Sequence, residues 1–266
     1  MESFIKYLGG KRKEIPKFEE YIPDEFDRYI EPCVGGGSLF FYLEKENSWI
    51  NDINKDLIQL YIDIKYNGDL IREELNKLIT VYNNFDMEHK SKMFYDIRCM
   101  FNGTLSSNYK RSTLYIFLNK TAFSGLYRVN SKGLYNTPFG KYNHISKNII
   151  LDEHINLLKN TDITNLNYID VFNGSNERDF MFLDPPYDTK FTEYGNDDKW
   201  TEEDHRKFAQ DFINLSCKSM IIINRTDLTV ELYGKYIKDS YCKSYVVNST
   251  TRLSEHGTEH IIVCNY

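Results

Sequence analysis

The feature that most constrains the fold is a strand, a glycine turn, a helix and a second strand within the first 52 residues. Residues 27–30 (DRYI) predict a strand that leads into residues 31–38 (EPCVGGGS). A helix is expected from Leu39, with Ser38 as its N-cap, and residues 48–51 (SWIN) predict a strand that ends at Asp52. This order is typical of the first unit of a nucleotide-binding α/β sheet. We therefore expect an α/β fold with a Rossmann-like sheet and helices on both faces.

The middle of the chain has a different pattern. Leu, Ile and Tyr recur at three- and four-residue spacing in residues 57–100, which predicts helices. Residues 127–135 (YRVNSKGLY) predict a β-hairpin, because Asn-Ser-Lys-Gly suits a type I turn whose last residue needs a positive φ. We expect residues 57–145 to be an inserted, mainly helical domain with a hairpin, and residues 1–56 and 146–266 to form the catalytic domain.

Strands and helices alternate again after the predicted insert. Thr201 and Asp204 are typical of a capping box that opens a helix extending to about Leu215. The predicted strands of this part are 167–169, 180–183, 220–223, 245–247 and 260–263. Two of these strands end at an acid, Asp170 and Asp184.

Composition excludes several classes of protein. No stretch approaches the roughly 20 apolar residues of a membrane span, and the N-terminal residues lack the continuous apolar region of a secretory signal. The five cysteines include no C-x-x-C pair, which argues against a disulfide framework and against a cysteine-based zinc site. A reducing cytoplasm is the expected location.

The charges are segregated along the chain, although the net charge is −6. Eight of the 33 Lys and Arg residues, but none of the 39 Asp and Glu residues, lie between Ile97 and Leu151. Such a window creates a local positive field, to which a phosphate backbone responds. A fluctuation of composition in a loop region is the alternative explanation. The length of the window favours a nucleic-acid-binding face.

The strongest local signal is the motif DPPY, residues 184–187, directly after an apolar strand. Two prolines stiffen the backbone and present Asp184 at the carboxyl end of the strand, where ligands bind in open α/β sheets. A carboxylate and a backbone carbonyl that accept hydrogen bonds from an exocyclic amine would direct its lone pair at an electrophile. Tyr187 could stack on the base, which must leave the duplex to reach such a site. The alternative is a rigid strand end with a surface acid.

The glycine turn favours an adenosine ligand without phosphates. Its three glycines permit close backbone approach, and Asp52 can accept from both ribose hydroxyls. Phe40 stands where a dinucleotide fingerprint has its third glycine, and Glu31 would repel a phosphate. A cationic adenosine ligand therefore fits better than a nicotinamide dinucleotide.

The motifs, and their order along the chain, resemble those of the Dam-type DNA adenine methyltransferases over nearly the whole chain. Residues 7–11 (YLGGK), 51–54 (NDIN) and 170–172 (DVF) are similar to further motifs of that family. The resemblance implies methyl transfer from S-adenosylmethionine to N6 of adenine in duplex DNA, leaving S-adenosylhomocysteine, with base flipping and in-line transfer. It implies the catalytic residues Asp184, Pro185, Pro186 and Tyr187 and no metal. The expected cofactor-binding residues are Tyr7, Lys11, Pro32, Gly35, Gly36, Gly37, Ser38, Asp52, Ile53, Asp170, Val171 and Asp184.

The insert is similar to the family's target-recognition hairpin in residues 118–128 and 138–141. By this resemblance Arg128 reads a guanine through O6 and N7, and Phe123 and Ser124 act near the position that the flipped base vacates. Lys141 stands where relatives that recognise GATC often have Arg, and without the planar fork it is expected to contact phosphate. The other expected DNA-binding residues are Asn119, Lys120 and Pro138. GATC is the predicted target.

Other interpretations remain open at this point. The acceptor could be N4 of cytosine or an RNA base, and the chain could be a catalytically silent DNA-binding regulator, although the intact Asp184 argues against that. We expect a monomer or a weak dimer on cytoplasmic, nucleoid-associated DNA, and the sequence leaves open whether a restriction endonuclease accompanies it.

Several further side chains have a structural as well as a functional interpretation. The order of His256 and His260 is not H-E-x-x-H, which disfavours a metal site. We expect Phe40, Phe41 and Tyr42 to pack in the core. Tyr194 and Trp200 either line the base site or pack beneath a loop.

Overall fold

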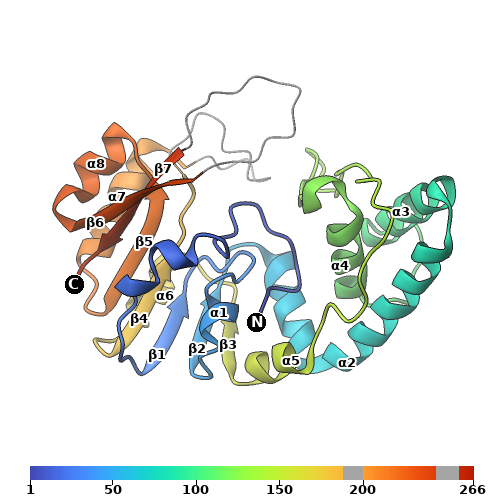
Figure 1. The fold of residues 1–266 in the computed structure, drawn as a ribbon, viewed down its shortest axis with the longest axis horizontal. Coiled ribbons are helices and arrows are strands. Elements are labelled where there is room, and N and C mark those ends of the chain that lie inside the picture. The colour runs from blue at the N-terminus through green and yellow to red at the C-terminus, as the bar shows by residue number, and fades with distance from the viewer. Residues whose placement is uncertain (188–199, 244–257) are drawn as a thin grey trace.

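The computed structural model describes residues 1–187, 200–243 and 258–266. Within these residues, strands form one seven-stranded sheet in the order β3-β2-β1-β4-β5-β7-β6 (Figure 1). The strands are β1 (Arg28–Glu31), β2 (Ser48–Asn51), β3 (Thr161–Thr164), β4 (Asp179–Leu183), β5 (Lys218–Asn224), β6 (Ile237–Lys243) and β7 (Thr258–Cys264). The strand predicted at residues 245–247 lies outside the described residues.

The sheet is parallel except at β7, which runs antiparallel to both β5 and β6. The chain moves outward from β1 to β2 and β3 and then returns to place β4 on the other side of β1. This reversal makes a topological switch point between β1 and β4, where ligands of open α/β sheets bind beyond the carboxyl ends of the strands. Glu31 and Asp184 both lie at that edge.

Helices cover both faces of the sheet, as predicted. Side chains alternate along the strands, so that Phe180 and Phe182 belong to one buried cluster and Met181 and Leu183 to the other. The first cluster includes residues of α1 (Phe40–Leu43), α2 (Lys55–Asn84) and α5 (Asp152–Lys159). The second includes residues of α6 (Tyr168–Asn173), α7 (Glu202–Ile213) and α8 (Asp227–Tyr233). Among the described helices, none is both long and apolar enough to cross a membrane.

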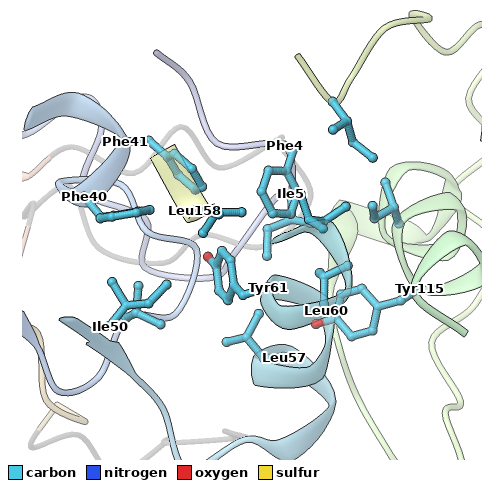
Figure 2. Packing of buried hydrophobic residues seen from close by; sticks show 14 of the residues in the cluster. Phe4, Ile5, Phe40, Phe41, Ile50, Leu57, Leu60, Tyr61, Tyr115 and Leu158 are labelled. Carbon is cyan, nitrogen blue, oxygen red and sulfur yellow. The ribbon is translucent and has the colours of Figure 1, made fainter. Parts of the chain in front are cut away.

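The residues between β2 and α5 form α2, α3 (Met87–Phe101) and α4 (Arg111–Thr121). In Figure 1 these helices lie to the right of the sheet, and the N-terminal segment runs between the two parts. Phe4 and Ile5 of that segment pack among side chains of α2 and α4 (Figure 2). One continuous apolar cluster therefore joins the sheet to these helices. The division into two domains stays a prediction.

The predicted hairpin is present in a minimal form. Gly133 has φ +73° and its N–H donates to the Asn130 carbonyl at 2.8 Å, while a single bridge pairs Val129 with Tyr135. The positive φ explains the glycine at the last position of the turn.

Two local predictions were wrong. Residues 167–169 are not a strand, because Asn167 caps α6 through its side chain, which accepts from Ile169 N. Ser38 does not cap α1, which begins at Phe40; its hydroxyl instead accepts from Lys11 N. The capping box of Thr201 and Asp204 at the start of α7 is confirmed.

Candidate active site

Asp184 follows β4 at the switch point and pairs with Lys11. Both oxygens of its carboxylate accept from Lys11 Nζ, each at 2.7 Å. The ammonium also donates to the Gly9 carbonyl at 2.9 Å, so it has three acceptors. Lys11 is 2% exposed and Asp184 26%. The residue expected to contact the cofactor therefore holds the acid of the DPPY motif in place.

The glycine turn is built around Asp52 at the end of β2. Asp52 is buried, and its two oxygens accept from Gly35 N and Asn54 N, each at 2.9 Å. Gly35 has φ +49°, and a Cβ there would lie 2.8 Å from the ring of Tyr7. Tyr7 therefore packs directly on the turn, and only glycine fits beneath it.

Three acids surround this turn. Burial raises the pKa of Glu31 to about 8, and the charges of Asp184 and Asp52 contribute to the shift. Burial also raises the pKa of Asp52, although backbone N–H groups, chiefly those of Asn54 and Gly35, partly offset it. Lys11 is the cation paired with Asp184 at this edge. With Glu31 protonated near neutral pH and Asp184 paired with Lys11, Asp52 leaves a net negative charge that favours a positively charged ligand.

The surroundings of Asp52 fit an adenosine. Ile53 exposes 63% of its surface beside it, which offers an apolar face to a base. Each carboxylate oxygen of Asp52 has a second lone pair beside the one that a backbone N–H occupies, as hydroxyl groups of a ribose require. Asp170 is exposed in the first turn of α6, whereas the Val171 side chain is fully buried. Pro32 is buried in the same turn as the glycines.

Two asparagines that the sequence analysis did not single out hold these parts together. Asn51 Nδ2 donates to the carbonyls of Pro32 and Leu166, at 2.9 and 3.0 Å. Asn165 Nδ2 donates to the Asp52 carbonyl at 2.7 Å. They tie the glycine turn to the loop between β3 and α6. Of the two, Asn51 could have been found from the sequence, because it is the last residue of a predicted strand and precedes Asp52.

Tyr187 follows Asp184 in the DPPY motif, and its ring contacts two other groups. Lys11 Nζ is 5.0 Å from the centre of the ring, and the His260 ring meets it at 5.3 Å and 88°. Pro185 is buried, and Pro186 is partly exposed. The structure thus gathers the DPPY motif, Lys11 and the glycine turn at one edge of the sheet.

The residues expected to bind DNA divide into exposed and buried ones. Phe123 is 57% exposed, and Ser124, Lys141 and Pro138 are also exposed. Phe123 N donates to the Pro138 carbonyl at 2.9 Å, which brings the end of α4 next to residues 138–141. Arg128 is exposed, and its Nε donates to Asn136 Oδ1 at 2.8 Å.

Asn119 and Lys120 are less accessible. Asn119 is 5% exposed, and its amide makes hydrogen bonds with the Lys6 N–H, the Lys6 carbonyl and the Gly125 carbonyl, at 2.7–2.9 Å. Its side chain therefore braces the N-terminal segment against α4. Burial lowers the pKa of Lys120 to about 8, with a further contribution from Lys6.

Among the described residues, the aromatic side chains with both a structural and a functional interpretation are buried in part. Phe40 and Phe41 are buried as predicted, but Tyr42 is 39% exposed and donates to Glu19, so the core prediction for Tyr42 was wrong. Trp200 packs against Tyr168 and Phe208, which favours its structural interpretation. Tyr194 and His256 lie outside the described residues. In the part of the chain that the structure describes, no three His, Cys, Asp or Glu side chains are arranged to hold a metal ion.

Comparison with known proteins gives this arrangement its context. Residues 7–251 match the family of D12 class N6 adenine-specific DNA methyltransferases. The chain belongs to this family. This adenine-specific DNA methyltransferase is 33% identical to the Type II methyltransferase M.CviBI of Paramecium bursaria Chlorella virus NC1A, with 100% of both chains covered.

Two further relatives agree with this assignment. The methyltransferase is 31% identical to the Type II methyltransferase M.MjaIII of Methanocaldococcus jannaschii, over 100% of this chain and 99% of the relative. It is 28% identical to the DNA adenine methylase of Serratia marcescens, over 96% and 93% of the two chains. The prediction of an adenine-specific DNA methyltransferase is confirmed.

Proposed function

We propose that this methyltransferase transfers the methyl group of S-adenosylmethionine to N6 of a flipped adenine in duplex DNA, at GATC. The observation that carries the proposal is the position of Asp184, which lies at the switch point beside Tyr187 and close enough to Glu31 to affect its titration. The choice of GATC rests on the similarity of residues 118–128 and 138–141 to the Dam-type hairpin.

The cofactor would be held by Asp52, Ile53 and Asp170. Asp52 would accept from the ribose hydroxyls and Ile53 would pack on the adenine, and the negative charge of Asp52 would favour a sulfonium over a neutral product. S-adenosylmethionine supplies an electrophilic methyl group on that sulfonium. Tyr7 packs on the glycine turn on which the cofactor would rest.

The acceptor amine would be held by Asp184 and the Pro185 carbonyl. Each Asp184 oxygen accepts from Lys11 with one lone pair and retains a second for an amine N–H. Two accepted hydrogen bonds favour a pyramidal nitrogen whose lone pair faces the electrophile. Tyr187 stacks on the base, an interaction worth about 1–3 kcal/mol. No strong base is required, since the amine becomes acidic once it is alkylated.

The exposed residues beyond α4 would recognise the target. Phe123 and Ser124 occupy the space that the flipped adenine leaves, and Arg128 reads a guanine edge in the major groove. Lys141 contacts a phosphate. We propose that the enzyme works as a monomer or a weak dimer on cytoplasmic DNA, and sedimentation with and without a GATC duplex tests its oligomeric state.

The test uses unmethylated plasmid, S-adenosylmethionine and an endonuclease that cuts only unmethylated GATC. We expect the wild-type enzyme to protect the plasmid, and Asp184→Ala to lose protection while binding DNA nearly as well as wild type. Digestion of the product to nucleosides should yield N6-methyldeoxyadenosine. Protection by Asp184→Ala would overturn the assigned acceptor site, and methylated adenine outside GATC would overturn the target. DNA binding without any methyl incorporation by the wild type would indicate a silent regulator.

A further inference from the structure

A buried cluster behind Tyr187 has no task in the mechanism above. Its centre is Glu14, which is 6% exposed and lies one turn beyond Lys11, with Glu14 N donating to the Lys11 carbonyl at 2.7 Å. Glu14 Oε2 accepts from His260 Nδ1 and from the Tyr241 hydroxyl, each at 2.8 Å. Glu14 Oε1 forms an ion pair with Lys243 Nζ at 2.6 Å.

The charge of Glu14 fixes the orientation of the histidine. Burial acts to raise the pKa of Glu14, but hydrogen bonds from His260 and Lys243 and the charge of Lys11 outweigh it and lower the pKa to about 2. An ionised carboxylate only accepts, so the hydrogen on His260 Nδ1 points at Glu14. His260 is fully buried, and among the described residues its Nε2 has no hydrogen-bond partner. Glu14 therefore accepts the hydrogen bond that fixes the orientation of the His260 ring.

The anchored ring meets Tyr187. The two rings are 5.3 Å apart and perpendicular, a geometry that stabilises aromatic pairs by about 0.5–1.5 kcal/mol. His260 lies on β7 and Tyr187 follows β4, so this contact reaches across the end of β5. The N-terminal turn of residues 11–14 thus contacts the first residue of DPPY directly and the last through His260. Lys11 pairs with Asp184, and Glu14 binds His260, whose ring packs on Tyr187.

We propose that Glu14 and His260 are positioning residues that hold the Tyr187 ring in the orientation in which it stacks on the flipped base. The proposal rests on the stacking role of Tyr187 in the proposed function. Neither residue touches the substrate. Their effect is to set the orientation of an aromatic surface before the base arrives, which lowers the entropic cost of binding it.

The test places 2-aminopurine at the target position of a GATC duplex and follows its emission in the complex with S-adenosylhomocysteine. Single-turnover methylation of the normal duplex and affinity for S-adenosylmethionine are measured in parallel. For His260→Ala we expect brighter emission, because the base stacks less, and methylation about three- to tenfold slower. Cofactor affinity should stay within about twofold of wild type. His260→Phe, which keeps an aromatic edge, should recover part of the rate.

Controls separate positioning from folding. His205→Ala removes another buried histidine, one that lies on α7 and packs against Trp200, and should leave emission and rate unchanged. Should His260→Ala fail to fold, Glu14→Leu tests the same contact, since it is similar in size but has no acceptor for His260 Nδ1. Wild-type emission and rate in His260→Ala, or in Glu14→Leu if that variant replaces it, would overturn the positioning role.

Tyr187→Ala separates this proposal from the function on which it rests. An impaired Tyr187→Ala enzyme with a normal His260→Ala enzyme rejects the positioning role alone. A Tyr187→Ala enzyme that methylates and quenches 2-aminopurine normally rejects the stacking role in the proposed function as well.

Discussion

At the scale of single residues, Lys11 connects the two halves of the active site. Its ammonium is buried between Asp184 and the Gly9 carbonyl, while its own N–H donates to Ser38 beside the glycine turn. The acid that we propose orients the acceptor, and the turn that we propose carries the cofactor, are thus held by Lys11 through its side chain and its backbone N–H. Hydrogen bonds to charged groups contribute about 1.5–3 kcal/mol each, so this residue should matter for both position and stability.

Lys11→Met keeps the length of the side chain and removes the charge. We expect methylation to slow by about 10- to 100-fold, since the Asp184 carboxylate loses two charge-assisted hydrogen bonds, and the melting temperature to fall. Labelled methyl incorporation and a thermal melt measure the two effects. Lys65→Met is the matched control, because Lys65 Nζ donates to the Thr161 carbonyl and, among the described residues, pairs with no acid. A Lys11→Met enzyme with the wild-type rate would show that the pair has no role in turnover.

Motif reasoning identified single residues but not their partners. Asp184, Asp52 and the glycines were found because each lies beside a predicted strand end, a position that local sequence reveals. The contact between Lys11 and Asp184 spans 173 positions, and the contact between Glu14 and His260 spans 246. Such pairs depend on the tertiary fold. For the same reason the pattern predicted Tyr42 in the core, while Glu19 and Arg12 hold it at the surface.

At the scale of elements, the hairpin at residues 127–135 holds Arg128, which we propose reads a guanine. Its guanidinium is already held by Asn136, through Nε to the side chain at 2.8 Å and through Nη2 to the carbonyl at 3.4 Å. The side chain is nevertheless exposed, so that its fork can turn towards a base edge. A side chain held in this way loses less entropy when it binds.

Arg128→Ala should therefore reduce discrimination more than affinity. We expect the ratio of kcat/KM on GATC to that on a duplex with a changed guanine to fall by about 10- to 100-fold, since a bidentate contact contributes about 1–3 kcal/mol. Binding to random DNA should weaken far less. Competition assays with the two duplexes provide the measurement, and equal losses on both would contradict direct readout.

The elements themselves were predictable where one local signal dominated. The apolar runs of β4 and β5 were sufficient to predict these strands, and the capping box was sufficient to predict the start of α7. Two starts were missed for different reasons. The run Asn167-Tyr168-Ile169 suits a strand or a capped turn, and the Asn167 cap prevailed. At α1, the N–H of Phe40 is satisfied by Glu31 from β1, so the helix needs no local cap.

At the scale of the whole molecule, the sheet concentrates acids at one edge, and this has a measurable cost. Glu31 has a pKa of about 8 in the folded chain against 4.5 as its ordinary value. Between these two pH values the unfolded chain loses a proton that the folded chain keeps. Stability therefore falls as pH rises through this interval, by about 1.4 kcal/mol for each pH unit, and the loss is complete above pH 8.

Glu31→Gln should remove this dependence. Its amide oxygen can accept from the Tyr29 hydroxyl and from Phe40 N as the carboxyl does, but it does not titrate. We expect the variant to match the wild type near pH 5 and to be more stable at pH 8. Urea unfolding across this range measures the difference. Parallel curves for the two proteins would show that Glu31 is ionised in the folded state.

The bracing of the N-terminal segment by Asn119 changes how a mutational survey of this enzyme should be interpreted. The hydrogen bonds of that amide go to Gly125 and to Lys6, which lies five positions before Lys11. A substitution at Asn119 would loosen the N-terminal segment, including Lys11, which pairs with Asp184. The enzyme would then lose activity although no contact between the protein and DNA had been removed. An inactive variant in α4 is thus no proof of a DNA contact. Protection footprinting of the bound duplex distinguishes a lost DNA contact from a loosened N-terminal segment.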